Sequence, residues 1–400
     1  MPSLLYSNVP EAAHPSFWII LFWICVSTAV YTYAGYPLLL WLVTRFKKDK
    51  PLEPSETPSL TLLIAAHNEE TGIGEKLKQS LSLNYPKDRL QILVVSDGST
   101  DDTVSVVRTY ARFGVELLVL AGQRGKTAAQ NVAILQANGD IIVFSDATTN
   151  YDVDALRYLA GAFADERVGA VSGRYAYVEE EHATERGQGA KAYAGYDNRL
   201  RHMQSSAGSI TGCCGCIYAV RRSLYVPLDP HIISDLVEPL HVLLQDKTVK
   251  FEPRAFAQEM VGHGSKKEFS MRVRVVTRAL NGLNSVREIL VPWKYPWIAF
   301  QLLSHKLLRY AIPLLLLGVF ASSLMLHQLP FYRMALTLQL LMYGMALLGA
   351  LAPVLRRFKP VSLALYFCVV NAAAFCGVIQ FLRGKNYVIW RPQRGTSHAA

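Results

Sequence analysis

Apolar residues are concentrated in four long runs, and the rest of the chain alternates between short apolar runs and polar stretches. The long runs cover residues 17–43, 307–326, 334–354 and 361–382, and they contain almost no charged residue. A helix that crosses the hydrocarbon core of a membrane needs about 20 residues. The first run lacks the basic leader and the cleavage site of a signal peptide. The pattern therefore predicts four membrane-spanning helices, with a soluble domain between the first and the second.

Within the soluble part, short apolar runs alternate with polar stretches of helical length. The runs at residues 60–66, 91–96, 115–120 and 141–146 predict buried strands. The intervening segments predict helices that end at Leu83 and Gln136, and one that begins with Asp101 or Asp102 as its cap. Strands that alternate with helices in this way are typical of a parallel, doubly wound α/β sheet.

Polar and acidic residues follow three of these strands. They are the His67-Asn68-Glu69 stretch, the Asp97-Gly98-Ser99 stretch and Asp146. Ligands of doubly wound sheets bind at the carboxyl ends of the strands, so we expect one crevice lined by these residues. The dinucleotide-binding pattern G-x-G-x-x-G does not follow the first strand, which argues against a nicotinamide-dependent oxidoreductase.

Composition and charge point to a membrane rather than to nucleic acid. The hydrophobic fraction is 51% and the net charge is +10. Basic residues cluster beside the long apolar runs, as in cytoplasmic flanks of membrane helices, where anionic lipids also favour them. We therefore expect membrane lipids as partners and no nucleic acid. Four spans would place the basic residues after the last run outside, so the number of spans and the side of the C-terminus stay open.

The cysteines do not form a disulfide framework. Three of the six are clustered, at Cys213, Cys214 and Cys216. A metal site would need a second pair at ligand spacing, which does not follow, so small residues packed at a tight turn are the favoured interpretation. The pattern fits a reducing cytoplasm.

Six stretches occur in the order seen in family 2 glycosyltransferases. They are AAHNEE, VVSDGSTDDT, RGKTAAQN, FSDATTNYDVDAL, TGCCGCIYAVRRS and SDLVEPLHVL. The chain resembles membrane-bound members of this family, the group of the hyaluronan, chitin, cellulose and poly-N-acetylglucosamine synthases. The resemblance covers about residues 58–285 and, through SHKLLRYAIP, part of the membrane region. It implies a Rossmann-like GT-A fold, a UDP-sugar donor, Mg²⁺ or Mn²⁺ as cofactor, and an inverting mechanism.

The resemblance also implies roles for individual residues. Asp97 matches the acid that contacts uridine, Glu69 the acid of the first strand end, and Lys126 the basic residue beside the diphosphate. Asp146 matches the first acid of the metal motif, and Asp235 the general base. Divalent cations of this kind prefer oxygen ligands, and a carboxylate can accept a proton from an acceptor hydroxyl. Each acid could instead be a helix cap or a turn residue.

The chain departs from the family pattern at several positions. Thr148 stands where the second carboxylate of the metal motif is expected, and Ser234 precedes Asp235 in place of Glu. Arg274 can stand for the arginine of the late Gln-x-x-Arg-Trp motif, where it would contact the donor, but Val275 replaces the tryptophan, which puts processivity in doubt.

Two further sets of residues have alternative interpretations. Arg272, Arg274 and Arg278 could form a solvated or lipid-facing basic stripe or contact phosphate. His263 could replace the missing metal ligand or be an ordinary loop histidine.

The expected organisation has five regions. These are a membrane helix at residues 1–44, a GT-A domain at 45–292, an interfacial amphipathic helix at 293–305, three membrane helices within 306–384 and a tail at 385–400. The interfacial helix is expected because residues 295–310 mix aromatic with basic side chains.

We expect a multi-pass protein of the cell inner (plasma) membrane with a cytoplasmic catalytic domain. It would transfer a sugar from a UDP-sugar to a lipid-linked or growing saccharide acceptor in cell-surface polysaccharide biosynthesis. The alternatives are a processive synthase that extrudes its own polymer, a transporter with a nucleotide-binding domain, and an inactive partner that only binds UDP.

Overall fold

The computed structural model describes residues 15–47, 57–178, 185–260 and 265–389. The chain divides into two compact units. One consists of Met1–Leu38 and Leu303–Cys376, and the other of Leu39–Leu302 and Gly377–Ala400. His263 lies outside the described residues.

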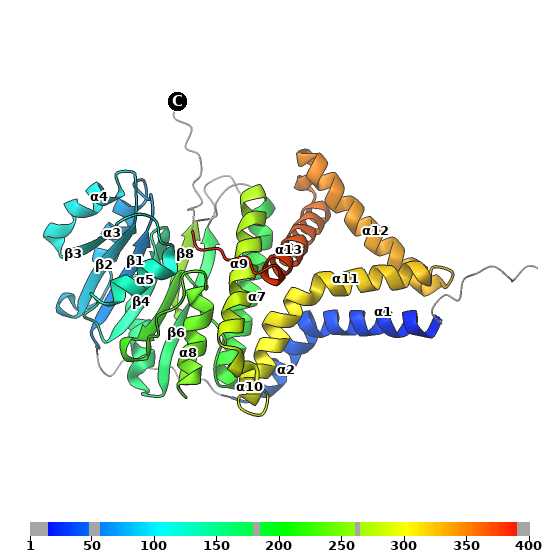
Figure 1. The fold of residues 1–400 in the computed structure, drawn as a ribbon, viewed down its shortest axis with the longest axis horizontal. Helices are drawn as coiled ribbons and strands as arrows, with labels where there is room; N and C mark the ends of the chain where they lie inside the picture. Colours follow the sequence, from blue (N-terminus) through cyan, green and yellow to red (C-terminus); the bar gives the residue numbers. More distant parts are fainter. Residues whose placement is uncertain (1–14, 48–56, 179–184, 261–264, 390–400) are drawn as a thin grey trace, which may run out of the picture. The chain divides into compact units, whose positions relative to one another are not determined.

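Four parallel strands form one half of the sheet in the second unit (Figure 1). Their spatial order is β3 (Val115–Leu120), β2 (Leu90–Asp97), β1 (Leu60–Ala66) and β4 (Ile141–Asp146). All residues of β1 are buried, because strands in the middle of a parallel sheet are covered on both faces, whereas β3 at the edge is partly exposed. The predicted parallel α/β arrangement is confirmed for these strands.

The other half of the sheet makes it a mixed sheet of eight strands. It contains β7 (Ile217–Arg221), β6 (Val168–Val178), β8 (Thr248–Met260) and β5 (Thr149–Tyr151), in this order outward from β4. β7 is antiparallel to both β4 and β6, and β8 is parallel to β6 and antiparallel to β5. The apolar pattern predicted none of these four strands.

Helices connect the strands and cover the sheet. The parallel strands are linked by α3 (Ile73–Leu81), α4 (Thr103–Thr109) and α5 (Lys126–Ile134), so the first and third end two residues before the predicted Leu83 and Gln136. At the start of α4, Asp101 Oδ1 accepts the Thr103 N–H at 3.1 Å. The remaining helices of this unit are α6 (Ala155–Gly161), α7 (Glu185–Ala207), α8 (Ser234–Leu244), α9 (Ser265–Ser285) and α10 (Pro296–Leu302).

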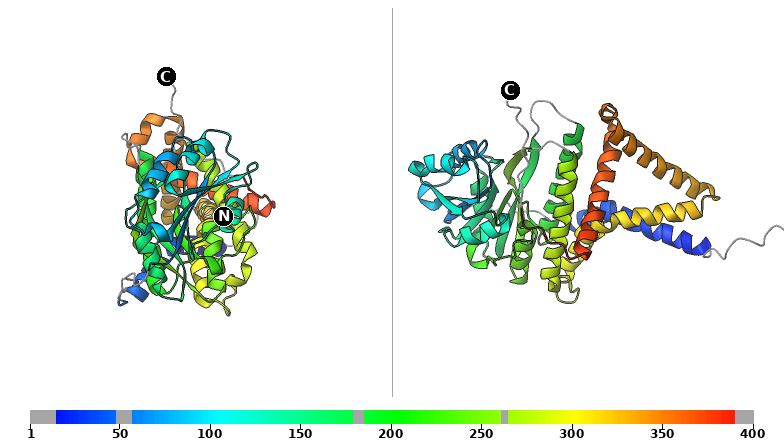
Figure 2. Two further views of the ribbon diagram at one scale, coloured as in Figure 1. Left: turned by 90° about the vertical axis from the view of Figure 1, so that its left-hand side faces the viewer. Right: turned by 45° about the horizontal axis from the view of Figure 1, so that its top comes forward.

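The first unit is built from long apolar helices. They are α1 (Pro15–Val30), α11 (Leu308–Met325), α12 (Pro330–Leu351) and most of α13 (Lys359–Leu382). α1 and α11 run side by side (Figure 1, Figure 2). Gly318 permits this close packing, since a Cβ there would lie 2.6 Å from Cys25 Sγ. Two π-helical turns, Tyr31–Gly35 and Leu303–Leu307, are joined by a 2.8 Å hydrogen bond between Tyr31 and Ser304.

Four continuous helices of the described chain are long and apolar enough to cross a membrane. They are Pro15–Thr44, which ends with α2 (Tyr36–Thr44), Pro296–Met325, Pro330–Leu351 and Lys359–Leu382. Each overlaps one of the four apolar runs. Residues 296–305 form the first part of the second helix, so a membrane-surface position for residues 293–305 stays a prediction, as do the five domain boundaries.

Candidate active site

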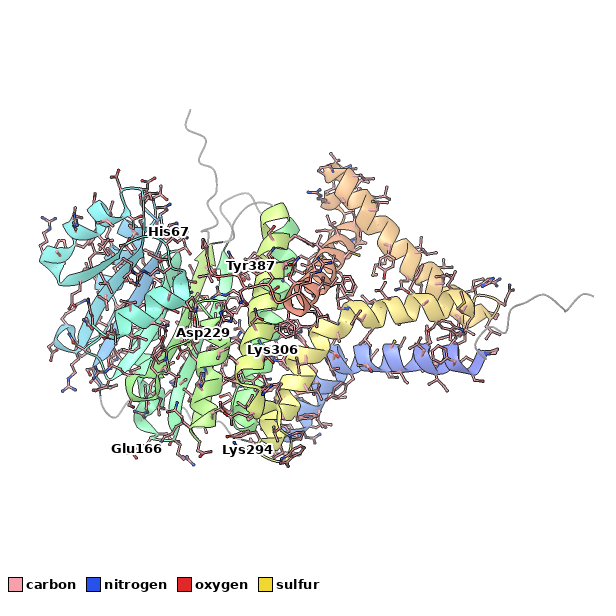
Figure 3. All side chains as sticks on the ribbon, in the orientation of Figure 1. His67, Glu166, Asp229, Lys294, Lys306 and Tyr387 are labelled. Atoms are coloured by element: carbon pink, nitrogen blue, oxygen red, sulfur yellow. The ribbon has the colours of Figure 1, made fainter. Side chains whose placement is uncertain are left out.

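The carboxyl ends of β1 and β2 carry the first two predicted site residues. The Glu69 N–H donates to Thr103 Oγ1 at 2.7 Å, which ties the loop after β1 to the start of α4. His67, in the same loop (Figure 3), places Nδ1 2.6 Å from the backbone oxygen of Asp97. The side chains of Glu69 and Asp97 are both buried. The structure therefore brings these two acids to one edge of the sheet.

Asp97 holds the turn that follows β3. Its Oδ1 accepts the Arg124 N–H at 2.7 Å, and its Oδ2 accepts the Gly125 N–H at 2.8 Å. An ionised carboxylate offers about four lone-pair sites, so acceptor capacity remains after these two bonds. Contact with uridine therefore stays a prediction for Asp97, and the backbone of residues 124–125 is a partner that sequence reasoning missed.

The turns after β2 and β3 touch through two glycines. Gly98 has a φ of +63°, in a backbone region that residues other than glycine rarely adopt. A Cβ on Gly98 would lie 2.3 Å from the carbonyl carbon of Gly122. Gly122 itself has a φ of +75°. The two turns therefore pack backbone against backbone, which brings Asp97 within reach of the second turn.

Lys126 and Asp146 form a direct ion pair. Lys126 is the first residue of α5 and Asp146 the last residue of β4, so the start of the helix and the end of the strand position the two groups. Burial lowers the pKa of Lys126, but the carboxylates of Asp146 and Asp235 outweigh it and raise the pKa overall. The lysine is therefore a cation at neutral pH.

Gly215 connects this pair with Asp235. Lys126 Nζ lies 3.4 Å from the Gly215 backbone oxygen. A Cβ on Gly215 would lie 2.7 Å from Asp235 Oδ2, in the first turn of α8. The Cys213 N–H also donates to the backbone oxygen of Asp235 at 2.8 Å. Lys126 thus links Asp146, its ion-pair partner, to the glycine beside which Asp235 lies.

The predicted metal ligands offer only part of a coordination shell. Asp146 supplies a carboxylate, and Thr148 is exposed two residues later. No group of three or more His, Cys, Asp or Glu side chains within the described part of the chain is arranged to hold a metal ion. Oxygen donors at Asp146 and Thr148 would suit a hard divalent cation that takes its remaining ligands from outside the protein.

Arg274, the last predicted site residue, lies on α9 one turn before Arg278. Arg274 is partly buried, and burial lowers its pKa. Arg278 is buried more deeply and binds backbone oxygens of the segment that precedes α8. The interpretation as a basic stripe exposed to solvent or lipid is therefore wrong for Arg278.

Glu259 is an acidic residue near the site that sequence reasoning missed. It lies on β8, paired in register with Thr149 of β5. Burial, followed by the nearby carboxylates of Asp146 and Asp235, raises its pKa from 4.5 to about 7, and Lys126 opposes that rise. Because β8 was not predicted as a strand, no sequence signal linked Glu259 to the loop after β4.

Lys76 is a second missed residue, and it supports the same loop. It lies inside α3 and is only 1% exposed. Its Nζ donates to the Thr149 backbone oxygen at 2.7 Å and lies 4.1 Å from the centre of the Tyr151 ring. Tyr151 OH in turn donates to the Cys216 backbone oxygen at 3.0 Å. Lysine is rarely buried, so a helical pattern could not reveal it.

The cysteine cluster forms a tight loop around Gly215. Cys213, Cys214 and Cys216 are buried, free thiols. The Cys214 N–H donates to Ser172 Oγ at 2.9 Å, which fixes the loop to β6. This agrees with the interpretation of small residues at a tight turn.

The segment after α13 lies against the turn that follows β3. The Asn281 side-chain amide of α9 donates to the Lys385 backbone oxygen at 3.3 Å and to Asn386 Oδ1 at 3.1 Å. A Cβ on Gly125 would lie 2.4 Å from the Val388 backbone oxygen. Tyr387, labelled in Figure 3, belongs to this segment, which the sequence had suggested only as a tail.

Comparisons with known proteins identify the class. Residues 61–226 match the family model described as "Glycosyl transferase family 2". Residues 61–226 are therefore a family 2 glycosyltransferase domain, and the predicted resemblance is confirmed for this part of the chain. The match covers the parallel strands and the loops with Glu69, Asp97, Lys126 and Asp146, and it ends before Asp235.

Three curated relatives with sequence similarity to this chain are glycosyltransferases or synthases by name. The chain is 37% identical over 129 residues to "Probable glycosyltransferase YdaM" of Bacillus subtilis, covering 31% of each chain. It is 34% identical over 161 residues to "Beta-monoglucosyldiacylglycerol synthase" of Synechocystis, covering 39% of this chain and 34% of that protein. It is 27% identical over 260 residues to "Poly-beta-1,6-N-acetyl-D-glucosamine synthase" of Staphylococcus epidermidis, covering 60% and 62%. In each case the matched part is less than two thirds of the relative's length.

A solved structure confirms the fold class. "Mannosyltransferase PcManGT from Pyrobaculum calidifontis in complex with GDP-Man and Mn2+" has a TM-score of 0.66, with 92% of this chain and 100% of that chain covered. Sequence identity is 23%, so the likeness is one of fold. The mixed sheet is therefore the Rossmann-like GT-A fold that the sequence predicted.

Proposed function

We propose that this protein is a membrane-embedded, inverting glycosyltransferase that moves a sugar from a UDP-sugar to a lipid-linked or growing saccharide acceptor. The observation that carries the proposal is that Lys126 links Asp146, its ion-pair partner, to Gly215, beside which Asp235 lies. Lys126 and Asp146 lie at the carboxyl edge of the parallel strands, where ligands of such sheets bind, and Asp235 lies in the first turn of α8. A cation and two carboxylates in this arrangement suit a crevice in which a charged donor meets a hydroxyl acceptor.

On the donor side, Lys126 would bind the diphosphate. It is the first residue of α5, and the positive end of a helix dipole favours an anion at that position. Asp146 and Thr148 would hold Mg²⁺ or Mn²⁺, which when bound neutralises charge on the leaving diphosphate. Asp97 would accept hydrogen bonds from the uridine, and Glu69 and Arg274 would also contact the donor.

On the acceptor side, Asp235 would accept the proton of the attacking hydroxyl. The backbone of Gly215 contacts both Lys126 and Asp235, so donor and acceptor groups are neighbours. Glu259 adds a carboxyl whose pKa of about 7 makes it largely protonated below neutral pH, which limits the negative charge near the diphosphate.

The setting would be the inner (plasma) membrane, with the catalytic domain on the cytoplasmic side. Four helices of the described chain are long and apolar enough to span, and basic residues flank them. The relatives include a beta-monoglucosyldiacylglycerol synthase and a poly-N-acetylglucosamine synthase by name, which supports membrane lipids and saccharides as partners in cell-surface polysaccharide biosynthesis.

The test is a panel of UDP-sugars and GDP-sugars incubated with purified full-length protein and Mg²⁺ or Mn²⁺, with released nucleotide measured. Turnover of one UDP-sugar that stops on metal chelation is the expected result. GDP-mannose is included because a solved structure of the same fold carries it. Absence of hydrolysis and transfer with every donor would overturn the proposal.

A processive synthase is the second candidate, because one relative is named as a polysaccharide synthase. Val275 at the position of the family tryptophan argues against it, since an aliphatic side chain gives a sugar ring no aromatic face. Product length separates the two: a single added sugar supports the first proposal, and a long polymer the second.

A further inference from the structure

Arg278 on α9 contacts two segments of the active-site domain that are far apart in sequence. Its side chain donates to Thr127 Oγ1 of α5 at 2.9 Å. It also donates to backbone oxygens of the segment before α8, at 3.2 Å for Pro230 and 3.3 Å for His231, and it reaches that of Ile232. Asp229, labelled in Figure 3, begins this segment.

These contacts lie next in sequence to Lys126, the proposed diphosphate ligand, and close in sequence to Asp235, the proposed base. Thr127 follows Lys126 directly, and Ile232 precedes Asp235 by three residues. Thr127 Oγ1 also donates to the Ile232 backbone oxygen at 2.8 Å, so the guanidinium, the hydroxyl and the carbonyl form a closed triangle. Arg278 is 8% exposed and Thr127 1%, so water competes little with these bonds.

The same face of α9 is fixed against α8. A Cβ on Gly282, one turn after Arg278, would lie 2.5 Å from Val237 of α8. This close approach leaves α9 little freedom to shift. Burial lowers the pKa of Arg278 to about 10, so the guanidinium keeps its charge at neutral pH and all its donors are available.

We propose that Arg278 is a positioning residue of the transferase, which fixes the separation of Lys126 from Asp235 by holding Thr127 and the Ile232 backbone together. This inference rests on the proposed function. Arginine suits the role because its planar fork can bind several acceptors at once, whereas the lysine ammonium is a single point on a flexible stem.

The role predicts that donor binding and sugar transfer respond differently to a change at position 278. Lys126 and Asp146 do not depend on Arg278 for their ion pair, so the donor should still bind. Small displacements of a reacting group can cost roughly 100-fold in rate, so transfer should suffer when Asp235 shifts.

The experiment compares wild type with Arg278→Lys, Arg278→Ala and the control Arg287→Gln, which changes an exposed arginine in the 3₁₀ turn after α9. For Arg278→Lys we expect transfer kcat to fall about 10- to 100-fold, with donor KM changed less than about threefold. Arg287→Gln should match wild type. Millimolar guanidinium should restore part of the transfer activity of Arg278→Ala, because it can occupy the vacated site.

A double-mutant cycle with Thr127→Val tests whether the triangle acts as a unit. If it does, Thr127→Val adds little to the loss already caused by Arg278→Lys. Hydrogen exchange at residues 232–237 provides a readout that does not require sugar, and it should become faster in Arg278→Lys.

Several outcomes would overturn the inference. One is a transfer rate of Arg278→Lys equal to that of wild type. Another is an equal loss of donor binding, donor hydrolysis and transfer in the variant, because a residue with a merely structural role would affect all three alike. If wild-type protein turns over no donor, the proposed function fails; if wild type is active and the Arg278 variants match it, only the positioning role fails.

Discussion

Lys126 and Asp146 form an ion pair between the first residue of α5 and the last residue of β4, at the edge where ligands of α/β sheets bind. The pair joins a predicted diphosphate contact to a predicted metal ligand. Its neighbour Thr148 occupies the place of a second carboxylate and is exposed.

The first prediction ranks the two members of the metal motif. Asp146→Ala should abolish transfer, because it removes the carboxylate and leaves Lys126 without its partner. Thr148→Ala should only weaken transfer, because a water can replace one neutral oxygen ligand. Initial rates over a titration of Mg²⁺ or Mn²⁺ measure both, and the reverse ranking would contradict the assignment.

The second prediction concerns the base. Asp235→Asn keeps the size of the side chain and removes its ability to accept a proton. Transfer should fall about 10²- to 10⁴-fold, while the affinity for the donor stays close to that of wild type. Rapid transfer by Asp235→Asn would show instead that Asp235 is not the base of the reaction.

The third prediction uses the glycine at the centre of the site. Gly215→Ala would place a Cβ 2.7 Å from Asp235 Oδ2, so the carboxylate must move. Transfer should fall about 10- to 100-fold without loss of folded protein. Gly195→Ala is the matched control, because nothing lies within 4 Å of a Cβ there. Equal activities of the two variants would show that the contact has no functional role.

The fourth prediction is a pH dependence of stability caused by Lys76. Burial lowers its pKa from 10.5 to about 7. Between these values the unfolded chain binds a proton that the folded protein does not, so stability rises with pH, by at most about 1.4 kcal/mol per unit. Lys76→Met should lack this rise. Thermal unfolding of detergent-solubilised protein at about pH 7 and about pH 9.5 measures the difference; an identical slope in both proteins would refute it.

The fifth prediction is that the cysteine cluster is chemically inert in the folded protein. Burial raises the pKa of the Cys213 thiol, and the contact with Cys214, together with burial, raises that of Cys216. A thiolate is the reactive form, so maleimide should label these residues only after unfolding. Peptide mapping by mass spectrometry distinguishes them from the other cysteines. Fast labelling of Cys213 or Cys216 in native protein would be the contrary result.

The parallel half of the sheet was predictable because its physical signal is local. β1 and β4 are buried on both faces, so continuous apolar runs mark them, and acids at their ends stand out. The other half of the sheet, in which β6 and β8 are parallel and the other pairs antiparallel, carries less of this signal. β5 is only three residues long, and β8 includes Lys250, Glu252 and Arg254. Long-range pairing rather than local composition makes these segments strands.

The same distinction holds for the site. Acids at strand ends could be found from the sequence, whereas Lys76, Glu259 and Arg278 are charged groups whose burial depends on tertiary contacts. A pattern of apolar and polar positions assigns such residues to the surface. Their partners are backbone oxygens or residues distant in sequence, so neither spacing nor composition could indicate them.

The contact between Gly98 and Gly122 bears on how this domain can be altered. Because the backbones of the two turns touch, a side chain at position 98 has no space unless the turn after β3 is rebuilt as well. Donor preference, if carried by these turns, therefore cannot be changed by grafting one of them. The turns after β2 and β3 therefore have to be replaced together, whether by engineering or in evolution.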